Sequence, residues 1–244
     1  MKLHHLLHSL LLLLSLCVTV LANAADLKAD KSQWDNTFSL VARDPVTGAV
    51  GGAVSTARLA VGNRVLSVEF GVGAVASQAN TNPMLARKAL DLMHHAATAQ
   101  EALDAALYAD DKREERQASA ISATGSKAAF TGNGPEDFKG HIIGKDVVVA
   151  GNILVGRETL EAILATFEST PGPLADRIMT ALEAGQKTGG DRRGKVSAAI
   201  LVLNEAPGTN SYARNIDLRV DSSTNPVGDL RTLFDAYKTA FKIK

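Results

Sequence analysis

Cysteine is nearly absent from this chain of 244 residues, since the one cysteine, Cys17, lies in an apolar segment near the N-terminus. The remainder of the chain therefore offers no disulfide, no thiolate nucleophile and no cysteine-ligated metal site. Aromatic residues make up 5% of the chain, and acidic and basic residues balance at 26 each. This balance argues against a nucleic-acid-binding surface. We expect the partner to be a small or roughly neutral molecule.

The first 24 residues differ from the rest of the chain. Lys2 and three histidines precede an apolar run at 10–21, which is followed by the small-residue pattern Ala-Asn-Ala ending at Ala24. This order is typical of a secretory signal peptide, and the apolar run is too short to predict a membrane-spanning helix. We expect cleavage near Ala24, export to the periplasm or the exterior, and no membrane contact after signal removal. Residues 25–36 are polar and aperiodic, which predicts a leader or linker.

Residues 37–244 are expected to form one domain in which strands and helices occur in clusters. Short β-rich or apolar segments separated by turn residues predict strands at 37–43, 49–55, 64–70, 71–78, 117–123, 127–131, 141–143, 147–150, 196–203 and 216–220. Apolar residues at helical spacing predict helices from 83, from 99 to 108, around 160–167, around 174–182 and from 226. This order favours an antiparallel α+β architecture, with two sheets packed face to face and helices outside.

Several common catalytic motifs are excluded. Residues 71–76 match G-x-G-x-x-A, but no helix begins directly after them, as a dinucleotide-binding turn requires, so they are interpreted as strand glycines. The chain has no G-x-S-x-G elbow, no phosphate-binding loop and no H-E-x-x-H zinc motif. After signal removal three histidines remain, His94, His95 and His141, and neighbouring helical positions point about 100° apart, so they do not suit one ion. We expect no metal and no cofactor.

A hydroxyl nucleophile with its own base is the chemistry that remains. A threonine at a chain terminus has such a base, because its α-amino group, with a pKa of about 8, accepts the hydroxyl proton. Thr37 lies where the polar leader meets the first predicted strand, and cleavage of the Asn36–Thr37 bond would release that amine. The alternative interpretation is that Thr37 is only a β-branched residue at the start of a strand.

Six segments of the chain together resemble the DUF1028 family, over roughly residues 37–203. They are TFSLVARDP at 37–45, LAVG at 59–62, GVGAVASQA at 71–79, TNP at 81–83, AGN at 150–152 and GGDRRG at 189–194. That family is similar to the N-terminal-nucleophile hydrolases, so the resemblance implies a four-layer αββα sandwich of two antiparallel sheets with outer helices. The family's biochemical role is largely unestablished, and some members carry a fimbrial-assembly label.

The resemblance implies that Thr37 is the nucleophile, since many members begin with Met-Thr-Phe-Ser and would expose that threonine on loss of methionine. This chain departs from the pattern, because cleavage after Ala24 would leave 12 residues ahead of Thr37. A second cleavage at Asn36–Thr37, by attack of the Thr37 hydroxyl on the preceding carbonyl, is then required for activity. Without it the protein is catalytically silent.

The resemblance also implies accompanying site residues. Oxyanion donors are expected where a strand meets the first helix, at Gln78 and Asn82, with Asn152 as a second amide. Turn and helix-cap roles are the alternatives for Gln78 and Asn82. Hydroxyls that orient the amine or relay a proton are expected at Ser39 and Ser55, and the expected substrate contacts are Asn80, Asp191 and Arg193. The alternative for the 189–194 loop is a plain solvated turn.

Three functions stay open from the sequence. The first is an exported amidohydrolase that cleaves a small amide, peptide or cyclic amide bond through an acyl-enzyme on Thr37. The second is a non-catalytic secreted or periplasmic binding protein, or a fimbrial or other surface-assembly accessory, with the same fold. The third is activity through an internal hydroxyl without processing. A homo-oligomer through an outer helix is compatible with the sequence, although no pattern indicates one.

Overall fold

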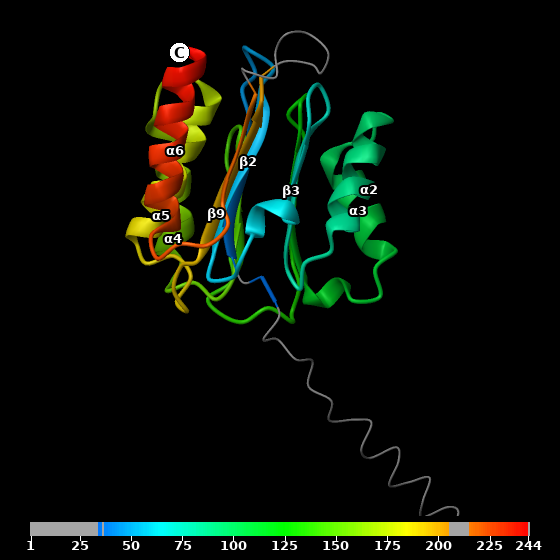
Figure 1. Cartoon of the computed structure of the whole chain (residues 1–244). Helices are drawn as coiled ribbons and strands as arrows, with labels where there is room; N and C mark the ends of the chain where they lie inside the picture. Colours follow the sequence, from blue (N-terminus) through cyan, green and yellow to red (C-terminus); the bar gives the residue numbers. More distant parts are fainter. Residues whose placement is uncertain (1–33, 36, 205–214, 244) are drawn as a thin grey trace, which may run out of the picture. The chain divides into compact units, whose positions relative to one another are not determined.

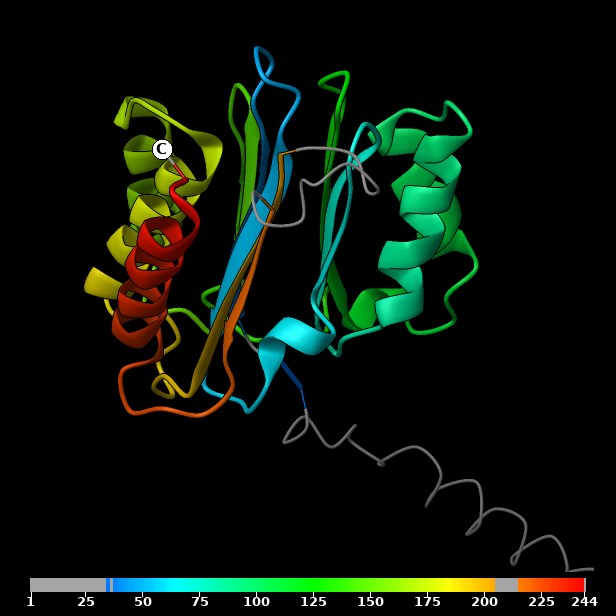
Figure 2. The same cartoon turned by 45° about the horizontal axis from the view of Figure 1, so that its top comes forward.

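The computed structural model describes residues 34–35, 37–204 and 215–243. The predicted signal peptide lies outside the described residues, as does the predicted leader except for Trp34 and Asp35. From Trp34 onward the described chain forms four layers, helices, sheet, sheet and helices, which Figure 1 shows side by side and Figure 2 shows from a second direction. None of the helices in this described part has the length and hydropathy that a bilayer span requires.

The first sheet has six antiparallel strands in the order β10-β9-β2-β1-β8-β7. Their bounds are β1 (Thr37–Arg43), β2 (Val50–Thr56), β7 (Gly140–Ile143), β8 (Val147–Gly151), β9 (Ser197–Leu203) and β10 (Ile216–Val220). β1 is central and pairs with β2 on one side and β8 on the other. A side chain at Gly52 of β2 would lie 2.6 Å from a backbone oxygen of β1, so this close contact requires glycine.

The second sheet has four antiparallel strands in the order β3-β4-β5-β6. Their bounds are β3 (Leu66–Glu69), β4 (Gly73–Ala79), β5 (Arg116–Ser122) and β6 (Lys127–Thr131). Two short 3-10 turns, η2 (Val61–Asn63) and η3 (Arg113–Glu115), precede β3 and β5. Small side chains of the two sheets meet in a buried apolar cluster that includes Val41, Val54, Ala74 and Ile121.

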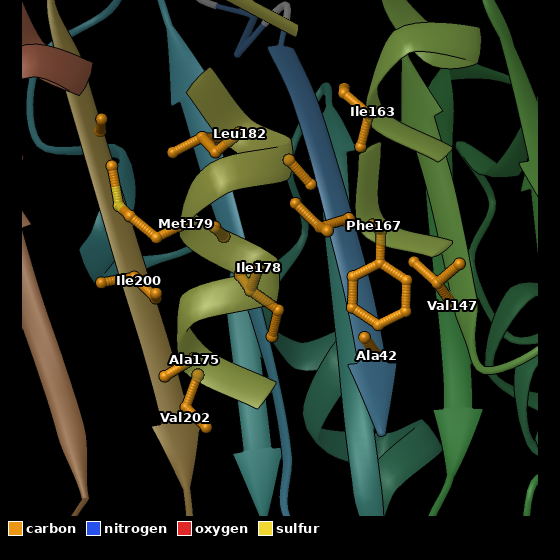
Figure 3. Packing of buried hydrophobic residues seen from close by; sticks show 14 of the residues in the cluster. Ala42, Val147, Ile163, Phe167, Ala175, Ile178, Met179, Leu182, Ile200 and Val202 are labelled. Atoms are coloured by element: carbon orange, nitrogen blue, oxygen red, sulfur yellow. The ribbon is translucent and has the colours of Figure 1, made fainter. Parts of the chain in front are cut away.

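Helices cover the outer face of each sheet. α4 (Glu158–Ser169), α5 (Leu174–Lys187) and α6 (Pro226–Phe241) cover the six-stranded sheet, and α2 (Pro83–His94) and α3 (Ala99–Tyr108) cover the four-stranded one (Figure 1). Figure 3 shows apolar side chains of α4 and α5 packed over the strands beneath them. Each fully buried residue of this kind contributes about 1.5–3 kcal/mol, so these contacts hold the helical layer on the sheet.

Side chains of β1 alternate between the two faces of its sheet. Phe38 and Leu40 belong to the cluster beneath α4 and α5, whereas Val41 belongs to the cluster between the sheets. Because a strand has a period of two, Thr37 and Ser39 share the face of Val41. The predicted nucleophile therefore points into the space between the two sheets.

The predicted α+β sandwich of two antiparallel sheets with outer helices is confirmed, and each of the ten predicted strands is present. The strand predicted at 64–70 is shorter, Leu66–Glu69, because the chain makes the turn η2 just before it. The helices predicted around 160–167 and 174–182 extend to Glu158–Ser169 and Leu174–Lys187. Periodicity identified these elements, and their ends depended on caps and turns.

Candidate active site

Thr37 is the first residue of β1 and has no solvent-exposed surface. Its hydroxyl donates a hydrogen bond to the backbone carbonyl of Asp35 at 2.5 Å. Its own carbonyl accepts a hydrogen bond from the backbone amide of Asn152 at 3.0 Å. The predicted nucleophile is therefore held at a strand end between the sheets, in contact with the last part of the predicted leader.

A buried chain of polar side chains lies beside Thr37. The Ser39 hydroxyl donates to Oε1 of Gln78 at 2.7 Å, and Nε2 of Gln78 donates to Oε1 of Gln117 at 2.8 Å. The side-chain amide of Asn152 donates to the same Gln117 oxygen at 2.7 Å. All four residues are 0% exposed. Each bond therefore forms in a low-dielectric interior and fixes both partners firmly. The structure thus brings together three predicted residues, Ser39, Gln78 and Asn152, with one that the sequence did not single out.

Gln117 is the residue that sequence reasoning missed. Besides accepting the two amide bonds, its Nε2 lies 3.0 Å from the carbonyl oxygen of Gly140 and 2.9 Å from that of Gly151. It therefore links the two sheets at the level of Thr37. The available signal was a long amide in β5, a strand otherwise made mostly of small residues.

Two buried polar atoms among the described residues have no hydrogen-bond partner, Oδ1 of Asn152 and Oγ of Ser119. An unsatisfied buried acceptor costs about 1–3 kcal/mol, so such atoms are rare and point to a function or a missing ligand. Asn152 lies opposite Thr37 across the β1–β8 ladder, one residue beyond the Phe38–Gly151 pair. Its free acceptor therefore lies close to the strand end that carries Thr37.

Backbone strain accompanies both site amides. Gln78 is followed by Ala79 with φ of 69°, and Asn152 is followed by Ile153 with φ of 50°. Residues other than glycine rarely occupy this left-handed region, and β-branched residues least of all. Strain of about 1–3 kcal/mol per residue persists only where the surrounding fold imposes it, commonly at functional sites. The fold therefore fixes the backbone conformation directly after Gln78 and after Asn152.

Asp35, from the predicted leader, is built into the fold and is 4% exposed. Its backbone exchanges two hydrogen bonds with Ala79, at 2.7 and 2.9 Å. Its carboxylate accepts two hydrogen bonds from the Arg64 guanidinium, both at 2.6 Å, and one from the Thr81 hydroxyl at 2.9 Å. The hydrogen bonds with Asp35 raise the pKa of Arg64 above its usual value, against the opposing effect of burial.

Trp34 lies next to Asp35 and is 4% exposed. Its carbonyl accepts a hydrogen bond from Nε of Arg58 at 3.4 Å. Its ring lies against the turn at Gly134, where an added Cβ would come within 3.3 Å of Cη2. With Trp34 and Asp35 in these positions, Thr37 is fully buried.

Ser55 lies on the opposite face of the sheet from the Thr37 side chain. It pairs with Phe38 across β1 and β2, and directly opposed residues share a face. Phe38 faces the helices, and the Ser55 hydroxyl accordingly donates to Oε1 of Gln186 on α5 at 3.4 Å. The register therefore does not bring Ser55 together with Thr37.

Asn82 and Asn80 bond away from Thr37. Asn82 caps α2, where its Oδ1 accepts from the Met84 amide at 3.1 Å and its Nδ2 donates to Asp110 at 2.8 Å. Nδ2 of Asn80 donates to Oε2 of Glu115 at 2.5 Å. Both side chains are thus engaged in joining β4 and α2 to neighbouring segments.

Asp191 and Arg193 bind each other. Asp191 is 3% exposed, and its carboxylate accepts from Nε and Nη2 of Arg193 at 3.1 and 2.7 Å. It also accepts from the backbone amide of Ala57 at 3.1 Å, and its backbone forms a bridge with Leu154. This loop is therefore anchored to the chain just after β2 and just after Asn152, rather than being a plain solvated turn.

The histidines bond separately. His94 contacts Glu69 at 2.7 Å and His141 contacts Thr131 at 2.9 Å. Among the residues that the structure describes, no group of three or more histidine, cysteine, aspartate or glutamate side chains is placed to hold a metal ion. The polar groups at Thr37 are accordingly hydroxyls and amides.

A family model and a solved structure match this chain and carry the same family description. A family model described as "Family of unknown function (DUF1028)" matches residues 37–230. The crystal structure of protein SPO2555 from Silicibacter pomeroyi, described with the same family, is 32% identical with a TM-score of 0.75, covering 83% of this chain and 89% of that one. Anbu (ancestral beta-subunit) from Yersinia bercovieri is a weak structural match, 12% identical with a TM-score of 0.37, covering 84% of this chain and 96% of that one. No curated protein matches.

Proposed function

This chain belongs to the DUF1028 family, and from the side chains that its fold gathers at Thr37 we propose that it is the precursor of an N-terminal-nucleophile amidohydrolase. Residues 1–24 direct export to the periplasm or the exterior, and cleavage of the Asn36–Thr37 bond produces the active form. The substrate is a small amide, peptide or cyclic amide.

Formation of the active enzyme follows from ordinary acyl-transfer chemistry. The Thr37 hydroxyl attacks the carbonyl carbon of Asn36, an ester forms, and the carbon–nitrogen bond breaks as the Thr37 nitrogen takes a proton. Water then hydrolyses the ester, which leaves a carboxylate on Asn36 and a free α-amine on Thr37. That amine is the base for later turnovers, in which the same hydroxyl forms an acyl-enzyme with the substrate and water releases it.

The single observation that carries the proposal is the unpartnered Oδ1 of Asn152 across the ladder from Thr37. In the uncleaved chain this acceptor is buried without a donor. A free α-amine at Thr37 brings new N–H donors to the same strand end, and Oδ1 of Asn152 is suited to hold that amine in position. The hydrogen-bond network therefore has an acceptor for the α-amine that cleavage creates at Thr37.

Two amides supply the stabilisation that an oxyanion needs. Nδ2 of Asn152 carries two protons and has one protein partner, Gln117, so one N–H is available. Nε2 of Gln78 donates one N–H to Gln117 at 2.8 Å and the other to the carbonyl oxygen of Thr37 at 3.5 Å. The second bond is long, so that N–H is the one that can turn to an oxyanion. Amides fixed before the reaction stabilise developing negative charge at little reorganisation cost, with about 3–4 kcal/mol lost per donor removed in well-studied hydrolases.

N-terminal sequencing and intact-mass measurement of the exported protein test the proposal. We expect a chain that begins at Thr37. Thr37→Ala should retain the leader, Thr37→Ser should lose it, and Thr159→Ala, which removes a buried hydroxyl on α4, should be cleaved normally. A correctly exported wild-type chain that keeps Asp35 joined to the domain and still hydrolyses an amide contradicts the mechanism.

The burial of Trp34 and Asp35 favours a second candidate function. If the leader remains joined, the protein is an exported binding or surface-assembly module in which these residues are permanent parts of the fold. The same sequencing experiment separates the two functions, because the module begins near Ala25 and shows no amidase activity.

A further inference from the structure

Arg64 forms a carboxylate-binding arrangement that does not depend on its present partner for its position. Its Nη1 donates to the carbonyl of Ala60 at 2.7 Å and its Nη2 to the carbonyl of Leu59 at 2.9 Å, which hold the guanidinium from its own loop. The edge formed by Nε and Nη2 of the guanidinium donates hydrogen bonds to both carboxylate oxygens of Asp35. Paired donors of this kind match a carboxylate in charge and in shape.

Asp35 connects this arrangement to the proposed nucleophile. Its carboxylate lies on Arg64 and Thr81, while its backbone carbonyl accepts the Thr37 hydroxyl. The proposed cleavage at Asn36–Thr37 separates Asp35 from the domain. Once the leader leaves, Arg64, whose side chain is 28% exposed, and the Thr81 hydroxyl lose the anion that they bind now. A partly buried cation without a partner is costly, so this site favours another anion.

We propose that Arg64 and Thr81 form the carboxylate subsite of the active site, and that the substrate is an amide whose acyl portion carries a free carboxylate. This inference rests on the proposed function, because it requires that Asp35 leaves the site. Asp35 and Asn36 lie on the acyl side of the bond that Thr37 attacks, so the acyl part of a substrate takes their place. Roughly six covalent bonds separate the Asp35 carboxylate carbon from the Asn36 carbonyl carbon, and this sets the reach between carboxylate and scissile amide.

Binding to the full-length chain tests the subsite without any turnover. Asp35→Ala in the Thr37→Ala background frees Arg64 while preventing cleavage. The probe is acetate, whose size matches the part of the Asp35 side chain that the substitution removes, and its matched control is the neutral acetamide. By calorimetry we expect the double variant to bind the acidic probe and not the neutral one, whereas Thr37→Ala alone binds neither.

Further variants assign that binding to the two residues. Adding Arg64→Gln should weaken it roughly 30-fold or more, and adding Thr81→Val should weaken it about threefold to tenfold. Arg43→Gln removes a similar part-buried ion pair, with Asp146 at 2.9 Å, from the other end of β1 and should leave binding unchanged. Asp35→Ser, which also shortens the side chain and leaves the carboxylate position open, replaces Asp35→Ala if circular dichroism shows that the alanine variant does not fold.

Three results would each overturn the subsite. They are equal binding of the two probes, no binding of the acidic probe to a folded Asp35 variant, and full binding of the acidic probe after Arg64→Gln. The kinetic counterpart uses protein that begins at Thr37. On that protein Arg64→Gln should raise KM for a pimeloyl amide, in which six bonds separate the two carbonyl carbons, at least tenfold and leave KM for the matching hexanoyl amide unchanged. If sequencing shows that Thr37 is never released, the proposed enzyme fails, whereas the binding experiment still decides whether Arg64 recognises a carboxylate.

Discussion

The side-chain amide of Asn152 donates to Oε1 of Gln117 at 2.7 Å, across the space between the two sheets. The same oxygen accepts from Gln78, so one glutamine holds two proposed oxyanion donors. β4, β5 and the end of β8 therefore meet at one atom. Because Thr37 is hydrogen-bonded to the backbone of Asn152, the arrangement also fixes the donors relative to the nucleophile.

Replacing Gln117 by methionine should destabilise the fold. Methionine is similar in length but accepts no amide bond well, so the N–H groups of Gln78 and Asn152 lose a buried partner. At about 1–3 kcal/mol for each unsatisfied group, we expect the free energy of unfolding to fall by about 2–4 kcal/mol in urea titrations. Gln100→Met on the exposed face of α3 should change it by less than about 0.5 kcal/mol. Equal midpoints for the two variants would refute this role for Gln117.

Asn152→Asp should shift the pH dependence of the mature enzyme. A carboxylate beside the α-amine of Thr37 favours the protonated ammonium, which raises the pKa of the amine. The acid limb of the rate profile, where the amine must be deprotonated, then moves to higher pH. Asn152→Ala should instead lower kcat by about 100-fold to 1,000-fold through loss of an oxyanion donor. A profile with an unchanged acid limb in Asn152→Asp would show that Asn152 does not contact the amine.

Asp110 should make the fold sensitive to acid. Hydrogen bonds from Arg116, and then from Asn82 and the Lys112 amide, lower the pKa of Asp110 to about 2, against a desolvation effect that raises it. Its side chain is 9% exposed. Because the folded pKa lies below the unfolded value of about 3.9, the ionised carboxylate stabilises the fold above that value, and this contribution is lost as the pH falls toward 2.

The amount at stake is about 2–3 kcal/mol, given about 1.4 kcal/mol for each pH unit of pKa difference. Unfolding free energies measured between pH 6 and pH 2 should therefore fall less steeply for Asp110→Asn than for the wild type. Asp217→Asn, which removes an exposed carboxylate paired with Arg219, is the matched control and should leave the slope unchanged. A wild-type slope in Asp110→Asn would exclude this ion pair as its source.

The sequence predicted the layers of this fold because apolar spacing reflects local geometry. The alternation in β1 sends Phe38 toward the helices and Val41 toward the other sheet, and the position of Thr37 on the inner face follows from it. Ser55 was misplaced because its face depends on the pairing register of β1 with β2, which no local pattern specifies. Register is a tertiary property.

The hydrogen bonds of the candidate site were harder to predict from the sequence than the residues that lie in it. Gln117 acts through partners on other strands that are distant in sequence, and a single glutamine in a strand carries no periodic signal. Trp34 and Asp35 belong to a polar, aperiodic segment, so nothing local indicated their burial. Asp35 is identified as part of the site by Arg64, 29 residues later in the chain. Long-range ion pairs of this kind become visible only in the folded molecule.

Trp34→Ala should loosen the segment that closes the site. A buried tryptophan truncated to alanine loses about 3–5 kcal/mol of packing, and Asp35 is the neighbouring residue whose carbonyl binds the Ala79 amide at 2.9 Å. In the Thr37→Ala background, where the leader stays joined, hydrogen exchange at the Ala79 amide should become at least tenfold faster. The Ser77 amide, bonded to Val65 within the same sheet region at 3.0 Å, should exchange at its wild-type rate. Equal acceleration at both amides would indicate general destabilisation, because only local opening of the leader separates the two.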